Sequence, residues 1–254
     1  MTNTLFVAWR SPEPNGPRWG PVGRLEHGPG GYRFVYTRGA MTLPDFQPFA
    51  EMPRLDAVYE SDELFPLFAN RLLSRSRPEY QAYLTWGGFD PNNPPDPIAL
   101  LAVTQGRRAT DQLELFPCPA RDTEGGYLNK FFLHGIRHMS ADAQSRVGSL
   151  RVGERLRAVP EDTNPSDPQA VAVFTEGDDV QIGYVPRYLA REVRDLFEQC
   201  GTMFAELQVE RVNPSAPMQQ KLLCRMSACW PEGFNPCTGG EFQPIVIGLG
   251  SALK

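Results

Sequence analysis

The chain has 254 residues, of which 41% are hydrophobic and 22% are charged, a balance typical of a soluble globular protein that can bury a core. Its formal net charge of −5 excludes indiscriminate coating of DNA, which needs a broad cationic surface, but is compatible with a small, selective nucleic-acid site. No segment approaches the roughly 18 uninterrupted apolar residues of a membrane helix, so no membrane contact is expected.

The N-terminal residues and the cysteines bear on the cellular compartment. The stretch MTNTLFVAWRSPEP lacks the basic and long apolar regions of a secretory signal, so secretion is not expected. The five cysteines are Cys118, Cys200, Cys224, Cys229 and Cys237. An odd number at irregular spacing does not form a disulfide framework, and we therefore expect a cytoplasmic protein.

In chain order, the first part of the sequence predicts a small antiparallel sheet with helices. Residues 5–9 and 32–36 are rich in β-branched and aromatic residues and are expected as strands, separated by the Pro- and Gly-rich residues 11–31. Residues 61–74 carry apolar residues at helical spacing, although Pro66 favours a later start of that helix. Residues 76–88 have a proline near their start and glycines at their end, which is typical of a second helix.

Two stretches share the prefix Asn-Pro-x-Asp-Pro and then enter an apolar run, NPPDPIALLAV at 93–103 and NPSDPQAVAVF at 164–174. In the first, Asp96 can cap a helix and Pro97 suits its first turn, and the apolar residues continue to Gly106 without alternation. In the second, the residues after the prefix alternate and predict a strand. The prefix alone forms turns, and it does not indicate a shared function.

The sequence predicts a domain boundary near residues 120–128. Residues 111–117 alternate as a last strand of the first domain, and residues 118–130 have the composition of a linker. We therefore divide the chain into domains 1–120 and 128–254.

The second domain is predicted as a small, partly open β-barrel with one or two helices. Strands are expected at residues 153–159, 169–175, 180–186, 204–212 and 221–228. Residues 187–200 have an apolar face and a charged face, with Gly201 past their end, and predict an amphipathic helix. The fold class of the whole chain is therefore expected to be α+β.

Residues of about 131–230 resemble the HIRAN domain, a module of some helicase-like DNA repair proteins and of stand-alone bacterial proteins. The matching segments are GIRH at 135–138, RVGSLRVGERLRAVPEDTNPSDPQAVAVF at 146–174 and IGYVPRYLARE at 182–192. A loop of the form N-P-x-D-x-x-A that enters a strand and is followed by I-G-Y-V-P is a specific pattern.

The HIRAN resemblance implies recognition of the 3′ end of single-stranded DNA by a shallow basic pocket. Asp167 would accept a hydrogen bond from a free 3′-hydroxyl, whereas a continuing strand would place an anionic phosphate there. Asn164 would hydrogen-bond a base or sugar, and Arg137 and Arg187 would hold phosphates. The alternative is that Asn164 and Asp167 serve only to form the turn.

Three further site candidates occupy positions where this sequence departs from the family. In the well-studied eukaryotic members, aromatic residues that stack on terminal bases follow the arginine, and the loop carries a tyrosine. Here these positions hold His138, Met139 and Ser166. Because stacking contributes about 1–3 kcal/mol per base, a lower DNA affinity is expected.

Residues 5–117 more loosely resemble the N-terminal subdomain of HipA-type kinases. The resembling segments are VGRLEHGPGGYRFVYT, LFPLFANRLLS and DPIALLAVTQGR, the last leading to LELFP. In that family the subdomain contacts other proteins and holds no catalytic residues. The resemblance therefore implies a protein-interaction domain.

No pattern in the sequence predicts catalysis, a metal or another cofactor. Cys224, Cys229 and Cys237 lack the tight pairing of structural zinc sites. The three histidines are isolated, and neither a phosphate-binding loop nor a nucleophile motif is present. The GLGS stretch near the C-terminus is too short for a phosphate-binding loop.

These features lead to the hypothesis of a non-enzymatic adaptor that binds a single-stranded DNA 3′ end. It would recruit or regulate a protein partner such as a HipA-like kinase, a nuclease or a helicase in defence or repair. The alternative is a pure protein-interaction module, such as an antitoxin that neutralises a HipA-like kinase toxin, with a vestigial DNA pocket.

Overall fold

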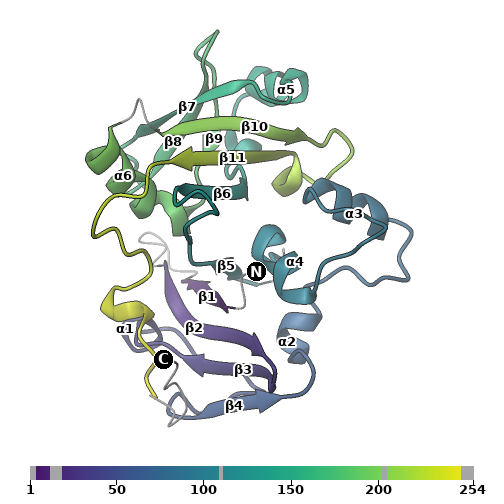
Figure 1. Cartoon of the computed structure of the whole chain (residues 1–254), viewed down its shortest axis with the longest axis vertical. Coiled ribbons are helices and arrows are strands. Elements are labelled where there is room, and N and C mark those ends of the chain that lie inside the picture. Colours follow the sequence, from purple (N-terminus) through teal and green to yellow (C-terminus); the bar gives the residue numbers. More distant parts are fainter. Residues whose placement is uncertain (1–3, 12–18, 109–110, 202–204, 247–254) are drawn as a thin grey trace. The chain divides into compact units, whose positions relative to one another are not determined.

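A computed structural model describes residues 4–11, 19–108, 111–201 and 205–246 (Figure 1). The GLGS stretch lies outside these residues. The chain divides into two compact units, each built from separate segments. The first unit comprises residues 1–75, 95–118 and 236–254, and the second unit comprises residues 76–94 and 119–235. The predicted domains 1–120 and 128–254 stay a prediction.

The first unit contains a five-stranded antiparallel sheet in the order β4-β3-β2-β1-β5. Its strands are β1 (Thr4–Arg10), β2 (Trp19–Gly28), β3 (Gly31–Tyr36), β4 (Val58–Ser61) and β5 (Leu113–Pro117). The expected strands near residues 5–9, 32–36 and 111–117 are confirmed, and so is the mixed α+β fold class.

The segment between the strands expected at residues 5–9 and 32–36 was not predicted to contain a strand, yet β2 occupies much of it. The Pro and Gly residues of β2 give it the composition of a loop, but in the structure they serve strand register and core packing. Pro21 lies where the register with β1 shifts, a position that tolerates the missing N–H. A Cβ added to Gly23 would lie 2.4 Å from the ring of Phe34, so the glycine makes room for this core aromatic.

Three short α-helices accompany the first sheet: α1 (Gly39–Thr42), α2 (Pro66–Ala69) and α4 (Pro97–Thr104). The predicted cap of α4 is confirmed, because an Asp96 Oδ1 oxygen accepts a hydrogen bond from the Ala99 N–H at 2.9 Å. The helix expected over residues 61–74 is reduced to α2, which begins at Pro66. The buried residues Phe34, Phe68 and Leu101 lie in the core that these elements share with the sheet.

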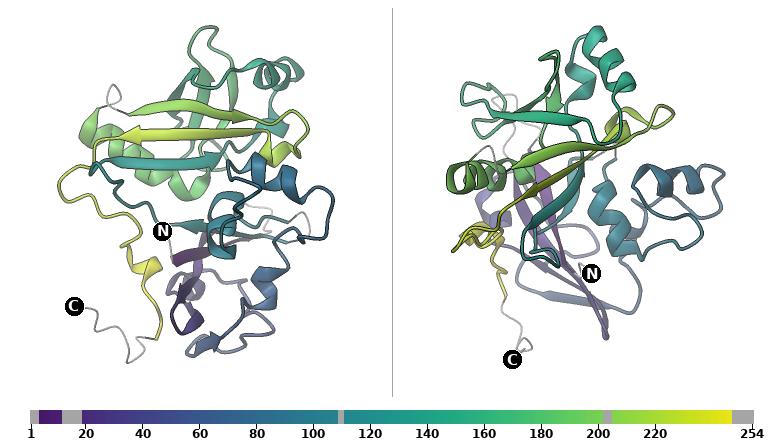
Figure 2. Two further views of the ribbon diagram at one scale, coloured as in Figure 1. Left: turned by 45° about the vertical axis from the view of Figure 1, so that its right-hand side comes forward. Right: turned by 45° about the horizontal axis from the view of Figure 1, so that its top comes forward.

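The second unit contains a six-stranded sheet in the order β6-β11-β10-β7-β8-β9. Its strands are β6 (Tyr127–Phe132), β7 (Arg155–Pro160), β8 (Val171–Thr175), β9 (Gln181–Tyr184), β10 (Glu206–Val212) and β11 (Leu222–Ala228). Figure 2 shows that this sheet is strongly curled. Strand β8 does not alternate as its sequence predicts, since Val171, Ala172 and Val173 are all buried and α6 packs against it.

The curled sheet closes at one point. His134, just after β6, exchanges two backbone hydrogen bonds with Tyr184 of β9, each 2.9 Å long. Gly183 permits this approach, because a Cβ there would lie 2.5 Å from the His134 carbonyl oxygen. The curled half-barrel agrees with the predicted partly open barrel.

The α-helices of the second unit are α3 (Tyr80–Trp86), α5 (Ala141–Ser149) and α6 (Arg187–Cys200). Helix α6 has the predicted amphipathic character, with Leu189, Val193 and Leu196 buried. It ends at Cys200 and is followed by Gly201, whose φ of 82° suits glycine. Helix α3 belongs to this unit although it precedes β5 in the chain.

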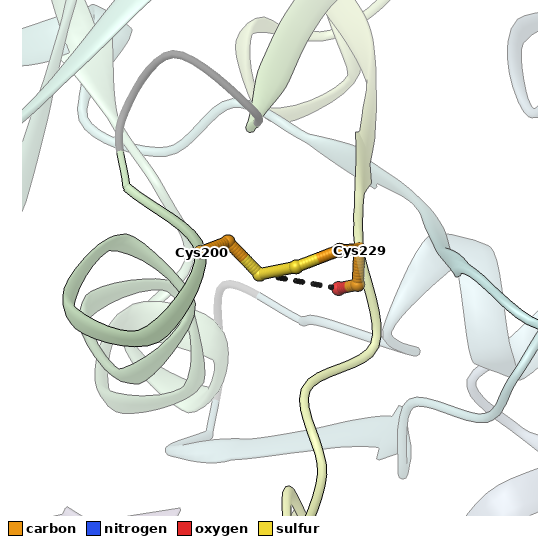
Figure 3. The surroundings of a disulfide bond; sticks show 2 residues. All are labelled: Cys200 and Cys229. Carbon is orange, nitrogen blue, oxygen red and sulfur yellow. Dashed lines mark hydrogen bonds between the residues drawn. A yellow bond between two sulfur atoms is a disulfide. The ribbon is translucent and has the colours of Figure 1, made fainter.

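A disulfide joins Cys200, the last residue of α6, to Cys229, which follows β11 (Figure 3). From the odd number and irregular spacing of the cysteines we expected no disulfide framework, and this disulfide departs from that expectation. Its partners are 29 positions apart in sequence, so only the fold brings them together. Cys224 is buried and has a free thiol.

The described part of the chain contains no helix with both the length and the apolar character needed to cross a membrane.

Candidate nucleic-acid interface

The candidate site is centred on the loop of residues 161–170, which connects β7 to β8. The loop is closed at its base, where the Glu161 N–H donates to the Ala170 carbonyl at 2.9 Å. Inside it, the Asn164 Oδ1 oxygen accepts hydrogen bonds from the N–H groups of Ser166 (3.0 Å) and Asp167 (3.1 Å). The Asn164 amide also donates to a Glu161 carboxylate oxygen at 2.8 Å. The Asn164 side chain therefore organises the loop from within.

The Asp167 carboxylate is half-buried and already has two partners. Its Oδ2 lies 3.2 Å from the Nε of Arg187, the first residue of α6, and its Oδ1 accepts from the Gln169 N–H at 3.0 Å. A carboxylate offers about four acceptor positions. Asp167 can therefore accept a further donor while Arg187 offsets its charge.

Gly135 begins a second segment of the candidate site, directly after the closure of the sheet. Its φ of 77° turns the chain into the short 3-10 helix η1 (Ile136–His138). Arg137 and His138 are exposed there, and the Arg137 Nε donates to the His138 Nε2 at 2.9 Å. Met139 follows, half-buried, and its carbonyl accepts from the Gln144 amide at 2.9 Å.

Tyr184 links these two segments, a role that the sequence did not reveal. A Cβ added to Gly135 would lie 2.9 Å from the Tyr184 ring, so the glycine admits the aromatic side chain. Burial raises the pKa of Tyr184, and the Glu161 carboxylate raises it further, while hydrogen bonds with Gln181 and Asn164 lower it. The ring therefore extends from the Gly135 turn to the start of the 161–170 loop. Its position in the I-G-Y-V-P pattern was the available signal.

The structure thus brings some of the predicted site residues into direct contact and places others nearby. Asn164, Ser166, Asp167 and Arg187 form one hydrogen-bonded group. Helix η1 carries Arg137 and His138 and is followed directly by Met139. It packs against β9. The DNA-contacting roles of all seven residues stay predictions.

Two of the three acidic residues of the loop pair with arginines of α6. Asp167 pairs with Arg187, and Asp162 pairs with Arg194, whose Nη1 lies 2.7 Å from the Asp162 carboxylate. Opposite charges at this separation reduce the repulsion that the loop would otherwise exert on a phosphate. The loop can therefore approach an anionic ligand despite its acidic residues.

The family model of the HIRAN domain matches residues 128–227. A HIRAN domain is thereby supported in this part of the chain. The resemblance of residues 5–117 to HipA-type kinases gains no support. No curated protein matches the chain.

Two solved structures resemble the HIRAN-matching part. One is the crystal structure of a protein from Lactobacillus plantarum, with 21% identity over 41% of this chain and 97% of that chain, at a TM-score of 0.32. The other is the crystal structure of the HIRAN domain of human HLTF, with 16% identity over 41% of this chain and 77% of that chain, also at a TM-score of 0.32.

Proposed function

We propose that the HIRAN domain of this chain binds the 3′ end of single-stranded DNA, with Asp167 as the group that distinguishes an end from a continuing strand. The observation that carries the proposal is the Asp167–Arg187 pair, which joins the 161–170 loop to α6 within the HIRAN-matching segment. An acceptor and a cation side by side suit a terminal nucleotide, which offers a hydroxyl donor and a phosphate.

In this mechanism a free 3′-hydroxyl donates to the Asp167 carboxylate while Arg187 contacts the adjacent phosphodiester. A strand that continues, or one that ends in a 3′-phosphate, places negative charge against Asp167 and lacks the donor. A hydrogen bond to a charged group contributes about 1.5–3 kcal/mol, which corresponds to a preference of about tenfold or more for the free end. Ser166 offers no ring, so base stacking falls to His138, and we expect modest overall affinity.

The test compares binding of short single-stranded oligonucleotides with a 3′-hydroxyl or a 3′-phosphate, measured by fluorescence anisotropy. Asp167→Ala should remove the preference, whereas Arg187→Ala should weaken binding of both oligonucleotides. Asp178→Ala is the matched control, because Asp178 also pairs with an arginine, Arg146, but outside the loop. Equal or absent binding of the two oligonucleotides by the unaltered protein would contradict end recognition.

We further propose that the chain is a non-enzymatic adaptor that recruits or regulates a protein partner. The first unit supports this role, because it has its own sheet and core and contains none of the predicted site residues. Co-purification with products of neighbouring genes tests the proposal, with a HipA-like kinase, a nuclease or a helicase as the expected class of partner. If no product of a neighbouring gene co-purifies with the chain, the adaptor role is contradicted.

One observation favours the alternative of a protein-interaction module, such as an antitoxin, with a vestigial DNA pocket. The side chains of Asn164 and Asp167 make their hydrogen bonds within the loop or to α6, as expected for a purely structural turn. A stable complex with a kinase toxin, together with no DNA binding, would decide for this alternative.

A further inference from the structure

Arg194 of α6 makes three polar contacts with the 161–170 loop. Its Nε donates to the Gln169 carbonyl at 2.9 Å, and its Nη2 donates to the Ala170 carbonyl at 2.8 Å. Its Nη1 contacts the Asp162 carboxylate at 2.7 Å. The Arg194 side chain is only 15% exposed, whereas that of Asp162 is 81% exposed. Of the three contacts, the one with the Ala170 carbonyl is partly buried, whereas those with Gln169 and Asp162 are exposed.

We propose that Arg194 is a positioning residue that fixes the conformation of the 161–170 loop and, through it, the place of Asp167. The inference deepens the proposed function and rests on it for its effect on DNA. Arg194 itself need not touch the nucleic acid.

The point at which Arg194 contacts the loop explains this role. The Ala170 carbonyl accepts both from Arg194 and from the Glu161 N–H, so the arginine braces the base of the loop. The Ala170 N–H in turn donates to the Asp167 carbonyl at 3.0 Å. A loss of the contact at Ala170 is therefore transmitted directly to the backbone of Asp167.

Besides the bonds within the loop, two contacts from helix α6 help to locate Asp167. Arg187 holds the carboxylate and Arg194 holds the base of the loop, seven positions apart on the same helix. Seven residues make about two helical turns, so both side chains leave α6 on one face. Because the helix is rigid, the separation of the two arginines sets where the Asp167 carboxylate lies relative to Arg187.

The planar fork of arginine suits these contacts, since Nε and Nη2 reach two successive carbonyl oxygens at once. A lysine at this position has the charge but a single ammonium group. Arg194→Lys should therefore restore only part of the function that Arg194→Ala removes.

The experiment uses the full chain and has two readouts. The first is backbone amide hydrogen exchange in residues 161–170, and the second is the ratio of affinities for 3′-hydroxyl and 3′-phosphate oligonucleotides. Arg146→Ala is the matched control, because Arg146 is also a partly buried helix arginine, paired with Glu154 at 2.6 Å and with Asp178 at 2.7 Å. It lines a shallow hollow that contains none of the loop residues.

We expect Arg194→Ala to accelerate exchange in the loop by about tenfold or more and to reduce the end preference from about tenfold to within about twofold. Arg146→Ala should change neither quantity. In an Asp167→Ala background, Arg194→Ala should cause no further loss of preference, because both changes act on the same group.

The outcomes separate the inference from the function on which it rests. Unchanged loop exchange in Arg194→Ala overturns the inference whatever the DNA result, and so does faster exchange with an intact end preference. If the unaltered protein shows no end preference but the loop of Arg194→Ala exchanges faster, the proposed function fails and the positioning of the loop stands.

Discussion

Tyr36 is a fully buried residue whose hydroxyl both donates and accepts a hydrogen bond. It donates to the Met52 carbonyl at 2.7 Å and accepts from the Phe49 N–H at 2.7 Å. Burial raises its pKa to about 12. One side chain at the end of β3 therefore ties the irregular segment around residues 46–52 to the sheet of the first unit.

Tyr36→Phe should lower the free energy of unfolding by about 1–3 kcal/mol, because Met52 and Phe49 would each keep a buried or partly buried backbone group without its partner. Urea unfolding monitored by fluorescence measures this loss. Tyr59→Phe is the control, since the Tyr59 hydroxyl makes the same two kinds of bond with Arg54 but in an exposed position. A comparable loss in both variants would mean that burial of the Tyr36 hydroxyl is not the cause.

At the scale of elements, the closure between β9 and the residue after β6 builds the candidate site. The bonds between His134 and Tyr184 bring the Gly135 turn beside the strand that leads to Arg187. The same closure requires a glycine at 183, where a Cβ would meet the His134 carbonyl oxygen and the Leu133 side chain. The closure of the sheet and the geometry of the candidate site therefore both depend on Gly183.

Gly183→Ala should destabilise the second unit by about 1–3 kcal/mol, because the new Cβ would lie 2.5 Å from the His134 carbonyl oxygen and force the closing strands apart. Thermal unfolding measures the loss, and exchange of the His134 and Tyr184 amides should accelerate. In the turn after β8, Gly177→Ala is the control, because its Cβ would meet nothing within 4 Å. Unchanged exchange at His134 in Gly183→Ala would refute this account of the closure.

The disulfide acts between elements, since it joins the C-terminus of α6 to the end of β11. Its partners are 29 positions apart, and the loop-entropy relation then predicts a stabilisation of about 3–4 kcal/mol through the unfolded state. Cys229→Ser, or reduction of the unaltered protein, should lower the free energy of unfolding by this order. Reductant should have no additional effect on Cys229→Ser, and an equal effect on both proteins would contradict the assignment.

At the scale of the whole molecule, the two units are not two consecutive halves of the chain. Residues 76–94 belong to the second unit although they precede β5 of the first. The amide of Asn213, which is buried, donates to the Trp86 carbonyl at 3.1 Å and to the Gln220 carbonyl at 2.8 Å. The segment with α3 is therefore part of the packing of the second unit.

A fragment of residues 119–235 should consequently be less stable than the same unit in the full chain, because it exposes the surface that residues 76–94 cover. Adding a peptide of residues 76–94 should raise its midpoint of thermal unfolding, and a peptide of the same composition in scrambled order should not. A fragment that is fully stable and indifferent to the peptide would contradict the assignment of α3 to this unit.

Local features could be predicted from the sequence because their partners are near in the chain. The Asp96 cap bonds to an N–H three residues on, and the Asn164 turn bonds to groups two and three residues on. The amphipathic pattern of α6 and its ending before Gly201 are equally local. The strand β2 was missed because the packing role of Gly23 depends on Phe34, which belongs to another strand.

The sequence by itself determined the α+β class, the turn at Asn164–Asp167 and the HIRAN pattern, because each depends on the order of residues within a short stretch. Only the tertiary structure decided that Arg187 faces Asp167, that Arg194 braces the same loop and that Cys200 pairs with Cys229. These contacts join residues 20 to 29 positions apart, on a helix and on segments that the curled sheet brings together. No periodicity or local preference specifies such a pairing, since it depends on how the elements pack.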